Sequence, residues 1–366
     1  MEGLFNRRYL RVKVMQAVYA FDSANQDLEA GEKMLVKSLD EVYDLYVHML
    51  SLLLEVVEVE RRSVERGKEK RIATEQDLNP NLRFALNEAA VTLENNKKFK
   101  LLSENINWNV ESDTIIKIWR ELKTDKKYMA FMSNPAKYHN FQQSVEILIY
   151  IFKNYIAVNE VFLDLFEERN IHWYDDVQLV SINVVKTLSA LRPGEVTLAE
   201  LDKAEAELER VQKELETNLD FSPTEVLDAE ENQRTIKEKW EEEVSKSILM
   251  PLFKNQKDDL KFTKELYAKT ILQGEDSMKL IEKYTTNWDV ERIARLDTVI
   301  MKIAITEFTS FPSIPVKVTI NEYLEIAKNY STEKSRVFIN GILDKVLIDL
   351  KAADKVKKTG LGLINR

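Results

Sequence analysis

The chain has 366 residues, 44% hydrophobic and 31% charged, a balance that allows a buried core in one large domain or in two to three smaller ones. It contains no cysteine, which excludes disulfides and thiolate metal sites, and it lacks the run of about 18 apolar residues that a membrane span requires. The net charge of −9 is uneven: residues 1–25 carry +2, residues 26–255 carry −14 and residues 256–366 carry +3. A nucleic-acid site is therefore to be sought at the ends of the chain, unless these charges only solvate helix surfaces.

The chain begins with a predicted helix that is rich in arginine. Residues 7–22, "RRYLRVKVMQAVYAFD", carry apolar side chains at helical spacing, with Arg7, Arg8 and Arg11 near the start. Cations at a helix N-terminus oppose the helix dipole, so these arginines need an explanation. The first residues lack the apolar core and cleavage site of a signal peptide, and we expect a cytoplasmic protein.

The acidic middle of the chain is predicted to consist of helices. Residues 30–67 indicate one long core helix, and breaks are expected at 77–84 and 133–141. Thr197 and Glu200 form a capping box that begins a helix over 197–218. A second box, "SPTE", places Pro223 at the favoured first helical position. The two strongly charged helices are expected to form a helical hairpin on the outside.

The C-terminal part shows the clearest helical pattern. One or two helices are predicted over 257–284, another over 287–308, and a further one over 318–330 with Thr319 and Glu322 as a capping box. A closing helix is predicted over 331–350. We expect residues 353–366 to form a mobile basic tail.

The closing helix contains "VFINGILDK", in which Asn-Gly is a strong hairpin signal. Phe338, Ile342 and Val346 nevertheless recur at every fourth residue, which is helical spacing. Gly341 inside a helix costs about 1 kcal/mol relative to alanine. We therefore expect a helix in which Gly341 permits the close approach of another backbone.

Two segments that lie 115 residues apart resemble each other. Residues 152–168 align without gaps with residues 267–283, with matching aromatic, apolar and acidic positions. Either the middle contains a degenerate copy of the C-terminal bundle, or two amphipathic helices match through their common pattern. The alignment alone leaves both interpretations open.

The sequence lacks the usual signatures of catalysis. His48, His139 and His172 are far apart, and neither a metal-binding spacing nor a glycine-rich phosphate loop is present. No nucleophile elbow occurs, and the acidic pairs are typical of solvated helix faces. We expect a protein that is not an enzyme and that has neither a metal nor a cofactor.

The two ends of the chain resemble the NusB family of transcription antitermination proteins. "NRRYLRVKVMQAVYAF" is similar to the arginine-rich first helix of that family, and "IPVKVTINEYLEIAK" with "FINGILDK" is similar to its C-terminal half. The match covers about residues 1–22 and 256–350. Some 230 residues that short members lack separate these two parts.

The resemblance implies an all-α fold, a NusB-like helical bundle with a large helical insertion. It implies binding of single-stranded boxA-type RNA in ribosomal RNA transcripts, together with the ribosomal protein NusE, as part of the RNA polymerase antitermination complex. The domains we expect are a first core helix at 1–25, an acidic helical insertion at 26–255, a C-terminal bundle at 256–352 and a basic tail at 353–366. The alternative is a helical protein-interaction scaffold that has lost RNA binding.

Candidate RNA contacts lie at both ends of the chain: Arg7, Arg8, Arg11, Lys13, Tyr19, Lys302, Lys317, Lys334, Arg336, Phe338 and Asn340. The cations of the first helix are expected to contact phosphates. Tyr19 and Phe338 are expected either to stack on bases or to lie in the core. Glu291 and Asp297 are assigned to the interface with the ribosomal protein.

Overall fold

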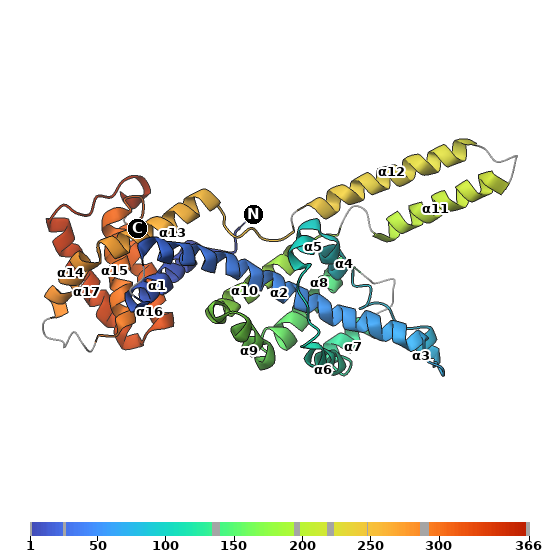
Figure 1. The fold of residues 1–366 in the computed structure, drawn as a ribbon, viewed down its shortest axis with the longest axis horizontal. Coiled ribbons are helices and arrows are strands. Elements are labelled where there is room, and N and C mark those ends of the chain that lie inside the picture. Colours follow the sequence, from blue (N-terminus) through green and yellow to red (C-terminus); the bar gives the residue numbers. More distant parts are fainter. Residues whose placement is uncertain are drawn as a thin grey trace. The chain divides into compact units, whose positions relative to one another are not determined.

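The computed structural model describes residues 2–24, 27–133, 140–193, 198–217, 223–246, 248–285 and 293–363, and none of these lies in a β-strand. The described chain is helical, as the sequence predicted (Figure 1). It divides into two compact units. Unit 1 combines Met1–Glu41 with Pro251–Arg366, and unit 2 comprises Val42–Met250.

Unit 1 is built around one largely buried helix, α15 (Arg295–Ser310). Its other helices are α1 (Arg7–Ala24), α13 (Gln256–Leu272), α14 (Gly274–Thr285), α16 (Val316–Tyr330) and α17 (Glu333–Ala352), with the first part of α2 (Leu28–Lys68). Helix α15 contacts each of the other five short helices. Because "VIMKIAITEF" carries apolar side chains on most of its circumference, this helix is stable only at the centre of a bundle.

In unit 1 the N-terminal residues pair with the segment that begins at Pro251. The backbone amide of Leu4 donates to the carbonyl of Pro251 at 2.8 Å, and that of Phe5 donates to Leu252 at 3.1 Å. A Cβ on Gly3 would lie 2.4 Å from the backbone nitrogen of Lys254, so only glycine fits this close approach.

Unit 2 contains the second part of α2 and the shorter helices of the middle region. These are α3 (Glu75–Leu78), α4 (Glu88–Asn95), α5 (Lys97–Ser103), α6 (Ser112–Leu122), α7 (Lys126–Ser133), α8 (Phe141–Ile151), a π turn η2 (Phe152–Ile156), α9 (Glu160–Arg169), a 3-10 turn η3 (Ile171–Asp176) and α10 (Val177–Ala190). Residues 42–59 of α2 are largely buried and form the centre of this unit.

Helices α11 (Leu198–Thr217) and α12 (Pro223–Ser245) pack along each other as the predicted hairpin (Figure 1). Pro223 is the first residue of α12, as expected, whereas Thr197 and Ser222 lie outside the described residues. The two helices together contain fifteen acidic and six basic residues. The hairpin therefore contributes much of the negative charge of the middle region.

The two segments that resemble each other have matching helix boundaries. Asn140 caps α8 by accepting a hydrogen bond from the amide of Gln143, and Asn255, 115 positions later, caps α13 through Asp258. The aligned positions Val158 and Gln273 both fall in the break between two helices. Buried side chains also coincide, as at Phe166 and Ile281. This correspondence favours a degenerate copy, and the repeat remains a prediction.

The structure corrects two predicted helix starts. Helix α15 begins at Arg295, with Ala294 as its N-cap, rather than at residue 287, and residues 286–292 lie outside the described chain. Helix α16 begins at Val316 after Pro315, and no side chain caps it. The predicted capping box of Thr319 and Glu322 is therefore wrong, because both residues lie inside α16, where Thr319 donates to Glu307 and Glu322 accepts from Arg8.

Two further expectations about the C-terminus are also corrected. "VFINGILDK" is helical, as predicted, but beyond the adjoining turns of α17 itself a Cβ built on Gly341 meets no atom of the described chain within 4 Å. No backbone approaches Gly341 there. The basic tail is docked rather than mobile as far as it is described, because Lys358 donates to the carbonyl of Phe311 at 3.0 Å and the amide of Thr359 donates to Pro312.

Candidate nucleic-acid interface

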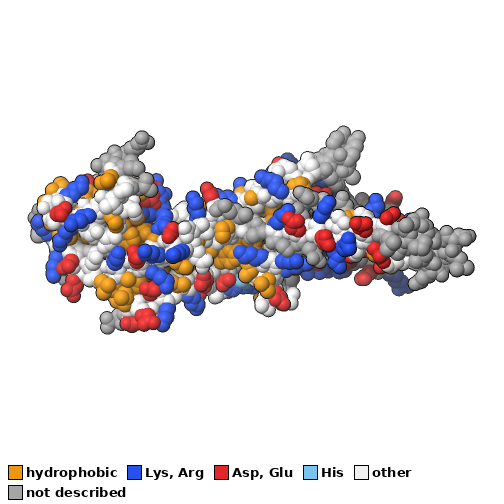
Figure 2. Space-filling model, turned by 90° about the horizontal axis from the view of Figure 1, so that it is seen from above, with side chains coloured by type: hydrophobic (Ala, Val, Ile, Leu, Met, Phe, Trp, Pro, Cys, Tyr) orange, Lys and Arg blue, Asp and Glu red, His pale blue; other side chains and the backbone are white. Residues whose placement is uncertain are grey.

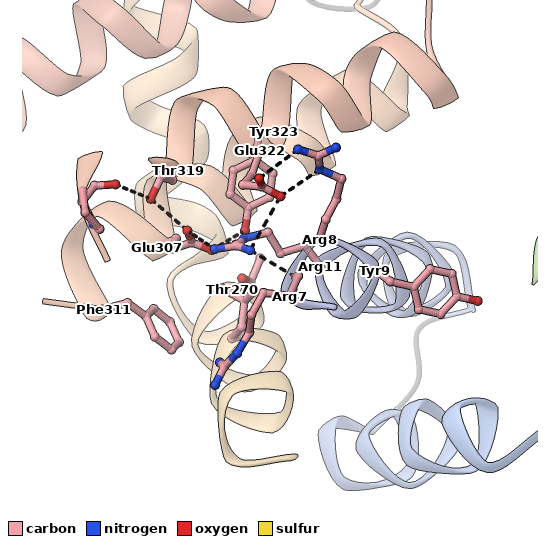
Figure 3. A network of polar contacts seen from close by, with 12 residues as sticks. Arg7, Arg8, Tyr9, Arg11, Thr270, Glu307, Phe311, Thr319, Glu322 and Tyr323 are labelled. Atoms are coloured by element: carbon pink, nitrogen blue, oxygen red, sulfur yellow. Dashed lines mark hydrogen bonds and ion pairs between the residues drawn. The ribbon is translucent and has the colours of Figure 1, made fainter. Parts of the chain in front are cut away.

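The three arginines of α1 point to three different helices of unit 1 (Figure 3). Arg7 pairs with an acidic residue of α13, Arg11 with one of α15 and Arg8 with one of α16. These pairs offset the unfavourable position of the cations at the helix N-terminus. The arginine cluster therefore has a structural role in attaching α1 to the C-terminal bundle.

The pair of Arg11 and Glu307 lies in the core. Two parallel hydrogen bonds join them, from Nε at 2.7 Å and from Nη2 at 2.8 Å. The hydroxyls of Thr319 and Tyr323 also donate to Glu307, at 2.8 and 2.9 Å. Glu307 is 0% exposed, so this charge is stable only because four donors surround it.

The same contacts determine the direction in which the pKa values of Arg11 and Tyr323 shift. Burial lowers the pKa of Arg11, but its hydrogen bonds and attraction to Glu307 outweigh burial, and the pKa lies above its usual range. Burial and the negative charge of Glu307 raise the pKa of Tyr323. Arg11 is thus a permanent cation and Tyr323 a permanent donor, and the Arg11 side chain is only 3% exposed.

Arg7 and Arg8 remain partly open to solvent. Each side chain is 44% exposed. Arg8 donates from Nε and Nη2 to Glu322 at 2.9 and 3.0 Å, and these hydrogen bonds raise the pKa of its guanidinium. Arg7 pairs with Asp259 at 2.9 Å and lies over the ring of Phe262. Each of these two side chains therefore combines a carboxylate partner with access to solvent.

The other candidates on α1 and α15 lie in different surroundings. Lys13 is buried, with its ammonium 5.6 Å from the ring centre of Tyr9. Tyr19 is 41% exposed and the guanidinium of Arg295 covers its ring at 5.3 Å. Lys302 is largely buried and pairs with Asp22 at 3.3 Å. As placed, Lys13 and Lys302 present little charge to solvent.

The candidates on α16 and α17 are spread over both helices. Lys317 and Lys334 are exposed, and Arg336 pairs with Glu333 in the first turn of α17. Phe338 is half-buried, and Asn340 donates to Asp344 at 3.4 Å.

Of the two residues assigned to the interface with the ribosomal protein, Asp297 and Glu291, only Asp297 lies among the described residues. Asp297 is 3% exposed and accepts a hydrogen bond from Ser331 at 2.6 Å. Glu291 lies outside the described residues.

The acidic partners of the arginines were not predicted from the sequence. Glu307 is the acidic residue inside the apolar run "VIMKIAITEF". Its position there signals a buried ion pair, because a carboxylate is rarely buried without a partner. Asp259 and Glu322 carry no comparable signal, since acidic residues on amphipathic helices usually face solvent.

The described surface mixes both signs of charge. On the face shown in Figure 2, lysine and arginine side chains are interspersed with acidic ones. Among the described residues, no group of three or more histidine, aspartate and glutamate side chains is placed to hold a metal ion. None of the described helices is both long and apolar enough to span a membrane.

The fold and this network define an all-helical protein. Its first helix begins with arginines that form ion pairs with a C-terminal helical bundle. The model of the NusB family matches residues 223–347, from the start of α12 into α17. Helix α1 lies outside that match, so its assignment rests on the similarity of its own sequence. No solved structure matches the chain.

Several relatives carry the name transcription antitermination protein NusB. That of Natranaerobius thermophilus is 37% identical over 102 residues, which cover 26% of this chain and 73% of the relative. That of Clostridium kluyveri is 39% identical, over 31% of this chain and 73% of the relative. The chain belongs to the NusB family.

Other relatives are covered less completely. The protein of Salinibacter ruber is 41% identical over 28% of this chain, and the alignment spans 64% of that relative. The protein of Chloroherpeton thalassium is 45% identical over 23% of this chain, and the alignment spans 40% of that relative. The chain thus covers less than two thirds of these two relatives.

Proposed function

We propose that this chain is a transcription antitermination factor, acting as a non-catalytic adaptor that binds single-stranded boxA-type RNA together with the ribosomal protein NusE for RNA polymerase. The relatives that carry the antitermination name support the role. The observation that supports RNA binding best is the pair of half-exposed arginines, Arg7 and Arg8, at the start of α1.

The chemistry of these side chains suits a phosphate backbone. A guanidinium binds phosphate through two parallel hydrogen bonds, and it stays charged at any physiological pH. Such contacts give affinity and salt dependence without reading the sequence. Lys317 and Lys334 supply further exposed cations on α16 and α17. Arg11 and Lys13 contribute mainly to the fold, because both are buried.

The test measures fluorescence anisotropy of a short labelled boxA RNA across a series of salt concentrations, with and without NusE. We expect binding that strengthens with NusE and weakens with salt. Arg8→Ala is expected to lower the affinity and to reduce the salt slope by about 0.7, the contribution of one phosphate contact to a single strand.

The control is Lys33→Ala, which removes an exposed lysine of the same unit that pairs with Glu29 at 2.7 Å. This variant should bind RNA like the unmodified chain. Equal losses for Arg8→Ala and Lys33→Ala would mean that only overall charge matters, and that Arg8 is not a contact.

A helical protein-interaction scaffold is the second candidate, and one observation favours it. All three arginines of the first helix already have a carboxylate partner within the chain. Absence of RNA binding under every condition would support this alternative. The acidic hairpin of α11 and α12 would then be the first surface to test for a protein partner.

A further inference from the structure

The pairing of Arg8 with Glu322 uses one side of the guanidinium and leaves another open. Both hydrogen bonds come from the edge that contains Nε and Nη2. The second terminal nitrogen, Nη1, lies away from that edge, and guanidinium carries donors on both terminal nitrogens. Since the side chain is 44% exposed, its outer edge can donate to an anion while Glu322 holds the inner edge.

Glu322 is itself held on a rigid element. It lies within α16, one residue before Tyr323, whose buried hydroxyl donates to Glu307. Its side chain is 20% exposed, and its carboxylate lies 3.9 Å from Nη1 of the buried Arg11. The Glu322 carboxylate therefore lies between the guanidinium of Arg8 and that of the buried Arg11.

We propose that Glu322 is a positioning residue for RNA binding: it holds the Arg8 guanidinium so that its outer edge meets a phosphate of a single strand. Glu322 does not contact the RNA itself. This inference rests on the proposed function of the chain. It assigns a role in recognition to an acidic residue, which charge alone would count as unfavourable for binding RNA.

The physical reason is the conformational freedom of a long side chain. An arginine without a partner must give up its rotamer freedom when it binds, which costs roughly three- to tenfold in affinity. The bidentate pair fixes the Arg8 side chain before RNA arrives. The opposing effect is the repulsion between Glu322 and the phosphate, so a test has to keep the charge constant.

The experiment uses the full chain with the labelled boxA RNA and two charge-conserving variants. Glu322→Asp shortens the carboxylate arm, and Arg8→Lys replaces the fork with a single ammonium. We expect each variant to bind RNA about three- to tenfold more weakly, with an unchanged salt slope. The double variant should lose less than the product of the two single losses, because both break the same pair.

The matched controls are Glu29→Asp, which shortens a carboxylate arm in the same way, and Lys33→Arg, which exchanges the two kinds of cation in the opposite direction; both lie in an exposed pair of the same unit. Both should bind like the unmodified chain. Thermal unfolding of Glu322→Asp should change little, since a partly exposed pair adds little stability. A loss of RNA binding without a loss of stability separates positioning from a purely structural role.

Three results would overturn the inference. Glu322→Asp could bind as well as Glu29→Asp while Arg8→Ala still loses affinity, which would leave the proposed function intact. A further variant, Glu322→Gln, removes the negative charge; if it binds RNA more than tenfold more tightly while Glu322→Asp is unchanged, Glu322 is a competitor of the phosphate. Failure of the unmodified chain to bind RNA would overturn both this inference and the proposed function.

Discussion

The substitution Arg11→Ala tests whether the buried ion pair fastens α1 to the bundle. It would leave Glu307, which is 0% exposed, with only the neutral donors Thr319 and Tyr323. Removing one partner of a buried pair typically costs about 3–5 kcal/mol, because the remaining charge has no compensation. For a unit of this size the same loss lowers the melting temperature by about 10 °C.

Arg8→Ala is the matched control, since Arg8 lies on the same helix and also has a bidentate carboxylate partner. Its pair is 44% and 20% exposed, so we expect a loss of at most about 1 kcal/mol. The difference between the two variants isolates the effect of burial.

The assay is hydrogen exchange followed by mass spectrometry, because it reports on each unit separately. Peptides from α15 should exchange faster in Arg11→Ala, whereas peptides from α8 in unit 2 should be unchanged. Equal protection of α15 in Arg11→Ala and Arg8→Ala would refute the reasoning. A loss below about 1 kcal/mol for Arg11→Ala would do the same, since it would mean that Glu307 needs no cation.

Three other substitutions have effects that the structure specifies. Gly341→Ala should stabilise the chain by about 1 kcal/mol in thermal or urea unfolding, because beyond the adjoining turns of α17 itself no described atom lies within 4 Å of the new Cβ; destabilisation would show an undetected contact. Gly31→Ala should instead destabilise by about 1–3 kcal/mol, because its Cβ would lie 2.0 Å from the Tyr267 hydroxyl, and a neutral result would mean that this ring moves aside freely. Hydrogen bonds from Lys70 and Thr74 lower the pKa of Asp77 from 3.8 to about 2. Its contribution to stability is therefore present above pH 3.8 and lost as the pH falls to about 2; Asp77→Asn should remove this step in an acid titration followed by NMR, and an Asp77 that titrates near 3.8 would contradict it.

Several features of the fold follow from sequence alone because they depend on neighbours within a few residues. The helical spacing of residues 7–22 and 30–67 predicted α1 and α2 to within two residues at each end. The periodicity of "VFINGILDK" outweighed its Asn-Gly hairpin signal, and α17 is a helix there. The family could be recognised in the same way, because its motifs are short and contiguous.

The interactions that hold these helices together could not be read from the sequence. Arg11 and Glu307 are 296 positions apart, and no local pattern states that they meet. Thr319 fits a capping box by its spacing, yet in the structure it donates to Glu307. The sequence predicts that Lys358 belongs to a mobile basic tail, whereas in the structure its ammonium donates to the carbonyl of Phe311.

The sequence by itself determined that the chain is helical, that its negative charge is concentrated in the middle and that its C-terminal part is that of the NusB family. The tertiary structure alone decided which arginine of α1 is buried and which two remain exposed. The physical reason is that helix formation depends on residues three and four apart, whereas the burial of a charge depends on which distant helices pack around it.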